Sequence, residues 1–336
     1  MLTLRLQVSP RLNFLVFLLL LWGCNPPAPT ANNGQTRIVV TTGMVGDLVQ
    51  HVAGEHAEVL TLYDAVDPHQ YAPTGSDIKE IMLADVVFYS GLHLEGPMAD
   101  AFEGRSRRGG EIHAVTERLA KEDVRTPEGS EGHPDPHVWH DPILWGQCAL
   151  DVGEILSEID PEHAADYRQN ALDYQQRLKE IDAFAQQVLG AIPEKQRHLV
   201  TAHDAFEYFA GRYGLEVRSI QGISTMSQAG LFDQERLIDF MVENQIPMIF
   251  VESTVPEKFV RQVIEGAHVK GWEVQKGDVL YSDAMGTPGT YEGTYIGMLD
   301  HNIATIGKGL GSKWEGPFSF QEYEQQQAAT ATEPAN

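Results

Sequence analysis

The amino-acid sequence predicts an α/β protein of two similar βα lobes, each with a parallel four-stranded sheet, joined by one long helix. First, short β-rich runs alternate with helical patterns twice along the chain, which is typical of parallel sheets covered by helices. Second, a long amphipathic segment separates the two alternating regions. Third, a length of 336 residues, 42% hydrophobic and 21% charged, suits two domains with sizeable cores.

Residues 1–23 are predicted to be a signal peptide. Arg5 and Arg11 precede the apolar run 12–22, which is about half as long as a membrane-spanning helix. The run ends in Leu-Trp-Gly-Cys, an order similar to a bacterial lipobox, so we expect Cys24 to be the acylated first residue of the mature chain. The Pro-rich residues 24–36 are predicted to form a flexible tether, and their prolines argue against the alternative of a buried N-terminal helix.

Charge and cysteine content restrict the function further. The chain has 24 Lys and Arg against 48 Asp and Glu, a formal net charge of −24, so nucleic acid is not an expected partner. The cysteines are Cys24 and Cys148. If Cys24 carries lipid, no intrachain disulfide can form, and Cys148, which lies in an apolar helical pattern, is expected to be a core residue.

Residues 37–160 are predicted to form the N-terminal lobe. Its β-rich runs and helical patterns alternate to give about four βα units. The predicted strands are 38–42, 59–63, 86–89 and 112–115, and the predicted helices lie near 45–53, 77–84, 96–102 and 143–159.

The segment 161–190 is predicted to be the helix that links the lobes. Apolar residues recur at alternating steps of three and four from Ala164 to Val188, which places them on one stripe. Asp160 can cap the start, and a glycine and a proline after the last apolar residue are stop signals. At about 1.5 Å per residue the helix is about 40 Å long, enough to reach from one lobe to the other. A coiled-coil arm is the alternative, although Ala and Tyr make a poor seam.

Residues 191–312 are predicted to form the C-terminal lobe, where the alternation resumes. Its predicted strands are 198–201, 216–221, 248–252 and 273–275. One predicted helix follows the first strand and ends at 213, and three others cover 234–243, 257–267 and 294–310. The tail 313–336 contains three consecutive glutamines and Ala/Thr repeats, and it is predicted to be disordered.

Potential metal ligands follow four of the predicted strands. His69 and His137 follow the second and fourth strands of the first lobe, and His203 and Asp283 follow the first and fourth strands of the second. Ligands of open α/β sheets collect at the carboxyl ends of strands, and the natural site between two lobes is the cleft. Three imidazoles and a carboxylate suit a divalent ion such as Zn²⁺ or Mn²⁺. Singly, each residue has an ordinary explanation as a hydrogen-bonding loop residue or a helix cap, so the hypothesis depends on the four together.

Long motifs are distributed over both lobes. They are PHQYAPTGSD (68–77), DPHVWHDP (135–142), TAHDAFEYFAGRYGL (201–215), IQGIST (220–225), FVEST (250–254), LYSDAMG (280–286) and GTYEGTYIGMLDHN (289–302). Through these motifs the sequence closely resembles, from residue 37 to 310, the metal-ion substrate-binding proteins of bacterial ABC transporters, the manganese/zinc class with a rigid interlobe helix. The resemblance implies the same four ligands, His69, His137, His203 and Asp283. It also implies an ABC permease and its ATPase as partners.

Two features depart from the pattern of that family. His140 stands where relatives usually have an apolar residue, so it forms a spare pair with His137 that could shift or supplement the site. The loop 126–140 has three histidines, whereas zinc-dedicated relatives often carry a long His-rich insert there, which favours manganese. Glu252 is a candidate to orient His203, and His301 is a candidate for a position behind the ligands.

These observations predict the solute-binding component of an ABC importer rather than an enzyme. We expect a monomer, anchored by lipid at the outer face of the cytoplasmic membrane, that captures Mn²⁺ or Zn²⁺ and passes it to the permease. A continuous helix resists bending, so closure is expected to be local movement around Asp283. The alternatives are a zinc-dependent hydrolase, although no HExxH or GxSxG motif is present, and a surface adhesin of the same fold.

Overall fold

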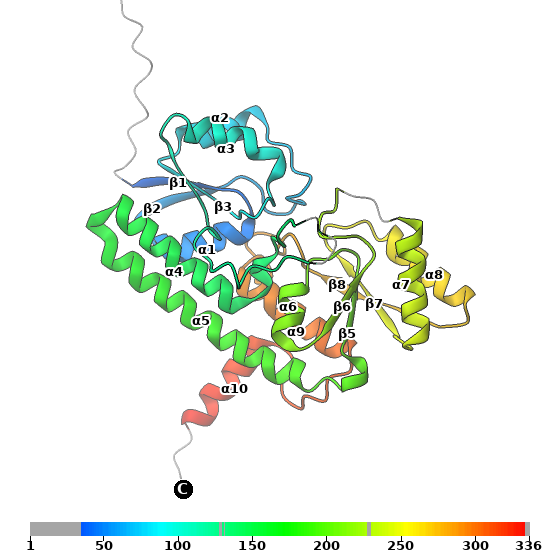
Figure 1. Ribbon diagram of the computed structural model, residues 1–336. Helices are drawn as coiled ribbons and strands as arrows, with labels where there is room; N and C mark the ends of the chain where they lie inside the picture. Colours follow the sequence, from blue (N-terminus) through cyan, green and yellow to red (C-terminus); the bar gives the residue numbers. More distant parts are fainter. Residues whose placement is uncertain (1–34, 128–129, 131, 227–229, 333–336) are drawn as a thin grey trace, which may run out of the picture. The chain divides into compact units, whose positions relative to one another are not determined.

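The computed structural model describes residues 35–332 apart from 128–129, 131 and 227–229, and these described residues belong to one compact unit. The predicted signal peptide, Cys24 and nearly all of the predicted tether lie outside the described residues. Two groups of parallel strands, each flanked by helices, form two lobes, and one long helix runs along both of them (Figure 1). The predicted α/β class with two βα lobes is therefore confirmed. Within the described ranges, no helix combines the length and apolar character needed to cross a membrane.

A four-stranded parallel sheet forms the first lobe, in the order β2-β1-β3-β4. The strands are β1 (Thr36–Val40), β2 (Ala57–Thr61), β3 (Val86–Tyr89) and β4 (Glu111–Ala114). Helices and 3-10 turns between and after them are α1 (Gly43–Ala53), α2 (Gly75–Leu83), η1 (Gly96–Met98), α3 (Ala99–Ser106), η2 (Val138–His140) and α4 (Pro142–Ile159).

Both faces of this sheet are covered. Successive residues of a strand point to opposite faces, so Ile38 and Val40 of β1 join the core cluster that contains residues of α1 and α4. Val39, between them, packs in a separate cluster with Ile81 of α2 on the other face. All three β1 residues are fully buried, which explains why the strand reads as an uninterrupted apolar run.

The second lobe differs from the prediction in its sheet. Its strands β5 (His198–Thr201), β6 (Glu216–Ser219), β7 (Met248–Glu252) and β8 (Gln275–Leu280) form two parallel pairs, β5-β6 and β7-β8, instead of one four-stranded sheet. β5 and β7 are neighbours, but beyond the end of β5 the His203 N–H donates to the Glu252 carboxylate (2.7 Å) instead of to a backbone carbonyl. The Glu252 side chain at the end of β7 is thus bonded to the loop that follows β5.

β8 also lies later in the chain than the predicted strand 273–275. Its residues Gln275, Lys276 and Asp278 are polar and exposed, and this lack of apolar alternation hides the strand in the sequence. The helices of the second lobe are α6 (Glu207–Tyr213), α7 (Leu231–Glu243), α8 (Lys258–Val269) and α9 (Tyr295–Gly309).

The helix predicted to link the lobes is α5 (Ala164–Gly190), 27 residues long. It packs against α1 and α4 of the first lobe and against α6 and α9 of the second (Figure 1). Its buried stripe includes the predicted residues Tyr167, Ala171, Tyr174, Leu178, Ile181, Ala185 and Val188. The α-helix begins later than predicted, because residues 161–163 form the 3-10 turn η3 (Pro161–His163) and Asp160 bonds the side chains of His163 and Tyr167.

The prediction of a disordered tail is wrong for residues 320–332, which form α10 (Phe320–Thr332). Phe320 is 1% exposed, and its ring lies 5.5 Å from that of Phe184 in α5. Its N–H donates to the Asp300 carboxylate (2.7 Å), and Arg177 of α5 pairs with Glu324. The Gln and Ala/Thr repeats predicted disorder because composition alone does not register the aromatic anchor at the start of the helix.

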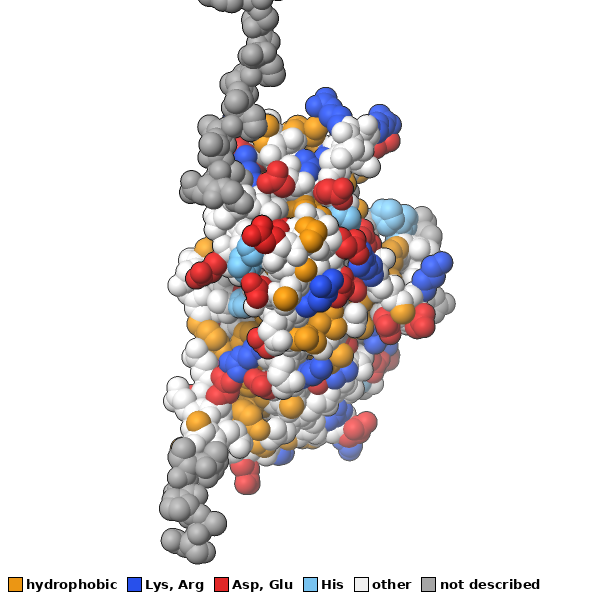
Figure 2. All heavy atoms as spheres, turned by 90° about the vertical axis from the view of Figure 1, so that its left-hand side faces the viewer, with side chains coloured by type: hydrophobic (Ala, Val, Ile, Leu, Met, Phe, Trp, Pro, Cys, Tyr) orange, Lys and Arg blue, Asp and Glu red, His pale blue; other side chains and the backbone are white. Residues whose placement is uncertain are grey.

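Charged side chains of both signs are spread over the face drawn in Figure 2, with apolar side chains among them in small groups. Basic side chains form no broad patch on this face.

Candidate metal centre

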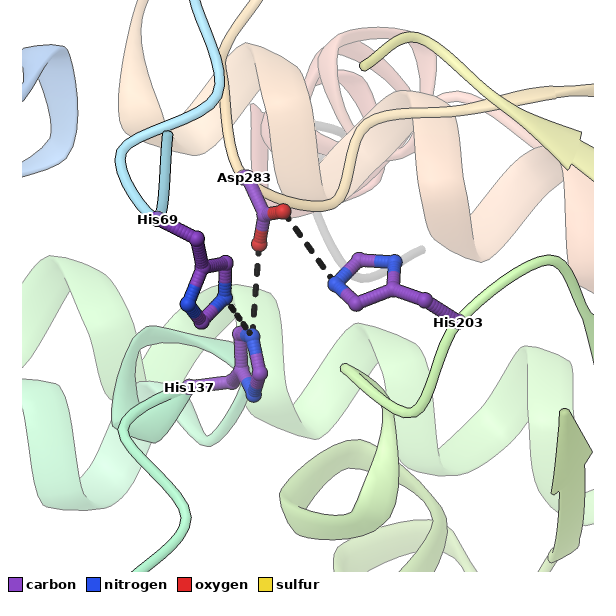
Figure 3. Close-up of side chains that lie close together, drawn as sticks. All are labelled: His69, His137, His203 and Asp283. Atoms are coloured by element: carbon purple, nitrogen blue, oxygen red, sulfur yellow. Dashed lines mark hydrogen bonds and ion pairs between the residues drawn. The ribbon is translucent and has the colours of Figure 1, made fainter. Parts of the chain in front are cut away.

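Loops from both lobes bring together His69, His137, His203 and Asp283. These loops follow β2, β4, β5 and β8, and the four side chains point toward a common centre (Figure 3). The potential ligand atoms all lie within 4.8 Å of one another, and all four residues are buried. The four residues singled out in the sequence therefore share one place in the structure, in the cleft between the lobes.

Two of the histidines are positioned by the same local motif, Asp-Pro-His. The Asp67 carboxylate accepts from the His69 N–H, and the Asp135 carboxylate accepts from the His137 N–H, each at 2.9 Å. Asp side chains commonly bond the backbone two residues ahead, and the intervening proline fixes its own φ. The motif thus forms a compact turn that presents the imidazole.

The Asp283 carboxylate faces the imidazoles. Its Oδ1 lies 3.3 Å from His137 Nε2, and its Oδ2 lies 3.1 Å from His203 Nε2. His69 Nε2 lies 3.2 Å from His137 Nε2. Neither Asp283 oxygen has a hydrogen-bond donor with good geometry among the described residues, although the side chain is 1% exposed. A buried carboxylate normally has such partners, so its arrangement fits a cation at the common centre.

Two further carboxylates hold the imidazole rings from behind. Asp135 Oδ1 lies 2.7 Å from His137 Nδ1, and Glu252 bonds both the N–H and Nδ1 of His203. When a carboxylate accepts from Nδ1–H, Nε2 is left free to coordinate, which is the usual arrangement of metal-binding histidines. The structure confirms the predicted contact of Glu252 with His203. Asp135 was not singled out in the sequence, although its repeat of the Asp-Pro-His motif was a usable signal.

The four groups shift one another's pKa values. Burial lowers the pKa of His69 to about 4. Burial also disfavours charge on His137 and His203, but the adjacent carboxylates outweigh it and raise the pKa of His137 to about 9 and that of His203 well above its ordinary value. Burial acts to raise the pKa of Asp283, yet the imidazoles, led by His203, hold it well below its usual range. Without metal, the raised pKa values favour protonated His137 and His203, and a cation can replace those protons.

The spare ligand pair proposed for His137 and His140 does not form. His140 is buried, but its ring packs on Phe206 with centroids 4.5 Å apart, and it is not among the four clustered residues. Burial, together with the neighbouring His137, lowers the pKa of His140 to about 3. His301 also lies outside the cluster, since its Nε2 bonds the backbone carbonyl of Val279 (2.8 Å).

A tryptophan connects the two lobes directly behind the site. Trp139 is the middle residue of η2 in the first lobe. Its indole N–H donates to the carbonyl of Ser282, next to Asp283 (2.9 Å). Tyr295 of α9 donates its hydroxyl to the Trp139 carbonyl (2.6 Å). The indole ring also packs edge-on against His137, with centroids 5.3 Å apart. These contacts fix the loop that carries Asp283, and no spacing in the sequence indicated them.

A cavity of about 470 Å³ leads from the surface to the site. Of the four candidate ligands, only His69 lines it, and that side chain is 5% exposed. Near this entrance, the Thr225 hydroxyl of the second lobe donates to Asp67 (2.5 Å), and Gln70 donates to Thr225 (3.2 Å). His69 is therefore the candidate ligand nearest the entrance, and its loop is bonded to the other lobe across the cleft.

Two βα lobes that share a continuous helix and enclose a His₃Asp cluster define a class, the metal-ion solute-binding proteins of transporters. The chain belongs to the family described as ZnuA, zinc-uptake complex component A periplasmic, which it matches over residues 38–309. This is a family of transport solute-binding proteins and not of enzymes.

Relatives of known description belong to the same class. The chain is 43% identical over 294 residues to the manganese-binding lipoprotein MntA of Bacillus subtilis, covering 86% of this chain and 95% of that protein. It is 33% identical over 289 residues to the iron-binding protein YfeA of Yersinia pestis, covering 85% and 89%. Among solved structures, the periplasmic zinc-binding protein TroA of Treponema pallidum is 39% identical, with a TM-score of 0.79 over 82% of this chain and 99% of that one.

Proposed function

We propose that this chain captures a divalent transition-metal ion, manganese or zinc, outside the cytoplasm and delivers it to the permease of an ATP-driven importer. The observation that carries this proposal is the Asp283 carboxylate, which is buried among three imidazoles and faces their nitrogens without a well-aligned donor. Membership of a family of transport solute-binding proteins supports the delivery step.

The proposed ligands are Nε2 of His69, His137 and His203 together with the carboxylate of Asp283. Affinity alone favours zinc over manganese at a site rich in nitrogen. Selection of manganese requires additional oxygen coordination, which Asp283 can supply if both of its oxygens bind. The names of the relatives specify manganese, zinc and iron, so the ion that this chain binds has to be identified by measurement.

Capture and release involve small movements in this proposal. α5 packs against both lobes without interruption, so wide rotation would break its backbone hydrogen bonds. The entrance loop of His69 and the loop of Asp283 are the parts that move, and the bonds between Asp67 and Thr225 break and form with them. Protons that return to His137 and His203 assist release.

The chain acts at the membrane surface as a monomer in this proposal. Cys24, which lies outside the described residues, is the proposed site of lipid attachment, and the names of relatives as lipoproteins support it. The predicted tether before β1 then links the outer face of the cytoplasmic membrane to the lobes.

The proposal is tested by competitive calorimetry on metal-free protein, with metal analysis of protein purified without chelator. One equivalent of Mn²⁺ or Zn²⁺ should bind at submicromolar concentration. Asp283→Ala should abolish this binding, whereas Asp278→Ala, which removes an exposed carboxylate of β8, should retain it. The site assignment is wrong if Asp283→Ala binds as tightly as the control. Growth in metal-starved medium after gene loss then tests transport.

A further inference from the structure

We propose that His93 and His133 form a second, weaker site for a divalent transition-metal ion at the mouth of the cavity that leads to His69. The two imidazoles would hold the ion first, with water completing its coordination, and the ion would then pass inward. This entry site rests on the proposed function, because its role is to supply the His₃Asp centre.

The spacing of the two rings matches that of the ligands in the main centre. The ring centroids of His93 and His133 are 5.8 Å apart, with an interplanar angle of 90°. Within the main centre, the ring pairs His69–His137 and His137–His203 are each 5.3 Å apart, and His69–His203 are 6.2 Å apart at 86°. The separation of the exposed pair therefore lies within the range of the buried ligands, and its interplanar angle is close to that of His69–His203, although the other two buried pairs are inclined at 57° and 71°.

Tight turns present both histidines. Leu92 and His93 have φ values of 52° and 68°, and the Leu94 N–H donates to the Gly91 carbonyl (3.0 Å), which closes a turn with both central residues left-handed. Residues other than glycine seldom adopt this conformation, and such residues concentrate at binding sites. On the other side, the His133 N–H donates to the Ser130 carbonyl (3.0 Å), and Pro134 restricts the backbone of His133 to extended conformations.

The cavity connects this pair to the main centre. His93, His133 and His69 all line it. Asp204 lines it between the lobes, and one of its carboxylate oxygens has no hydrogen-bond partner among the described residues. The described lining contains no Lys or Arg, so no fixed positive charge opposes the passage of a cation.

An entry site has a kinetic signature that separates it from a structural contribution to the main centre. It speeds entry and exit by the same factor, because it lowers the barrier between solvent and the main centre without changing either end state. Loss of the pair should therefore lower the association and dissociation rate constants together, by about tenfold for a cleft that concentrates cations, and leave the dissociation constant unchanged.

The first experiment measures these rates by stopped-flow tryptophan fluorescence, since Trp139 contacts His137. The variant His93→Gln/His133→Gln is compared with wild type and with His268→Gln, which removes another exposed imidazole. We expect both rate constants to fall in the double variant only. Unchanged rates would overturn the entry site, and so would a changed dissociation constant, which would place the effect on the main centre.

The second experiment detects the ion directly. Full-length protein is loaded with one equivalent of Zn²⁺ to fill the main centre and is then titrated with Mn²⁺ while its imidazole NMR signals are recorded. Paramagnetic Mn²⁺ should broaden the signals of His93 and His133 before that of His268. Equal broadening of all three, or none, would overturn the proposal. Failure of the first equivalent of Zn²⁺ to bind would instead contradict the proposed function, because the Mn²⁺ titration reports on the exposed pair separately.

Discussion

Replacing Glu252 by Gln should weaken metal binding although the side chain never touches the ion. Glu252 is 4% exposed and accepts two hydrogen bonds from His203, one from the backbone N–H and one from Nδ1. Both donors need an acceptor, and a carboxylate provides two. An amide of the same shape provides one acceptor and one donor, so it cannot satisfy both groups of His203.

Either orientation of the amide interferes with coordination. If its oxygen faces the backbone N–H, its NH₂ group donates to Nδ1, and the proton of His203 then resides on Nε2, the nitrogen that must bind the metal. If the amide turns around, its NH₂ group opposes the buried backbone N–H. An unsatisfied buried donor costs about 1–3 kcal/mol, and loss of a carboxylate behind a metal-binding histidine lowers affinity by about 10-fold to 100-fold.

Competitive titration of metal-free protein with a chromogenic chelator measures this loss. Glu257→Gln is the matched control, because Glu257 lies near β7 in sequence but pairs with Lys276 at the surface. Thermal unfolding of both metal-free variants shows whether the fold is retained. If Glu252→Gln binds metal within about twofold of the control, the orienting role assigned to this carboxylate is wrong.

Four further predictions follow from the same geometry. Metal affinity should rise with pH up to about 9, because the raised pKa values of His137 and His203 mean that the ion displaces protons. Calorimetry in buffers of different ionisation enthalpy should detect the released protons, and binding without proton release would contradict the prediction. The His137 contribution to the stability of metal-free protein should be present below pH 6.5 and lost as the pH rises through about 9, since its folded pKa lies above the ordinary 6.5. Urea unfolding of wild type and His137→Gln at several pH values isolates this contribution. A difference in unfolding free energy that does not change with pH would refute the prediction. Trp139→Phe removes the donor to the Ser282 carbonyl and should weaken metal binding by about 1–2 kcal/mol in the same titration, whereas unaltered affinity would show that the bond does not fix the Asp283 loop. Phe320→Ala should lower the free energy of unfolding by about 3 kcal/mol and leave metal affinity unchanged, and an unchanged urea midpoint would mean that α10 does not stabilise the lobes.

The cluster of the four candidate ligands could be predicted because these residues follow strand ends, which topology brings together. His69, His137 and His203 each follow a β-rich run, and parallel strands place such positions at one edge of each sheet, next to the cleft between the lobes. The long helix was equally accessible, since its apolar stripe repeats with helical spacing. In both cases a local pattern in the sequence determines the position.

The remaining features depend on contacts between distant residues. The division of the second lobe into two strand pairs and the bond from the His203 N–H to Glu252 are both long-range features that no periodicity encodes. The Trp139 bond to Ser282 joins residues of different lobes. α10 depends on the burial of Phe320 against α5, whereas the composition of its later turns resembles that of a disordered tail.

Anomalous diffraction from crystals grown with Mn²⁺ or Zn²⁺ tests the central claim most directly. We predict one strong peak between the lobes, bonded at about 2.0–2.3 Å to Nε2 of His69, His137 and His203 and to the carboxylate of Asp283. A principal peak elsewhere on the protein, or a central ion that lacks any of these four ligands, would contradict it.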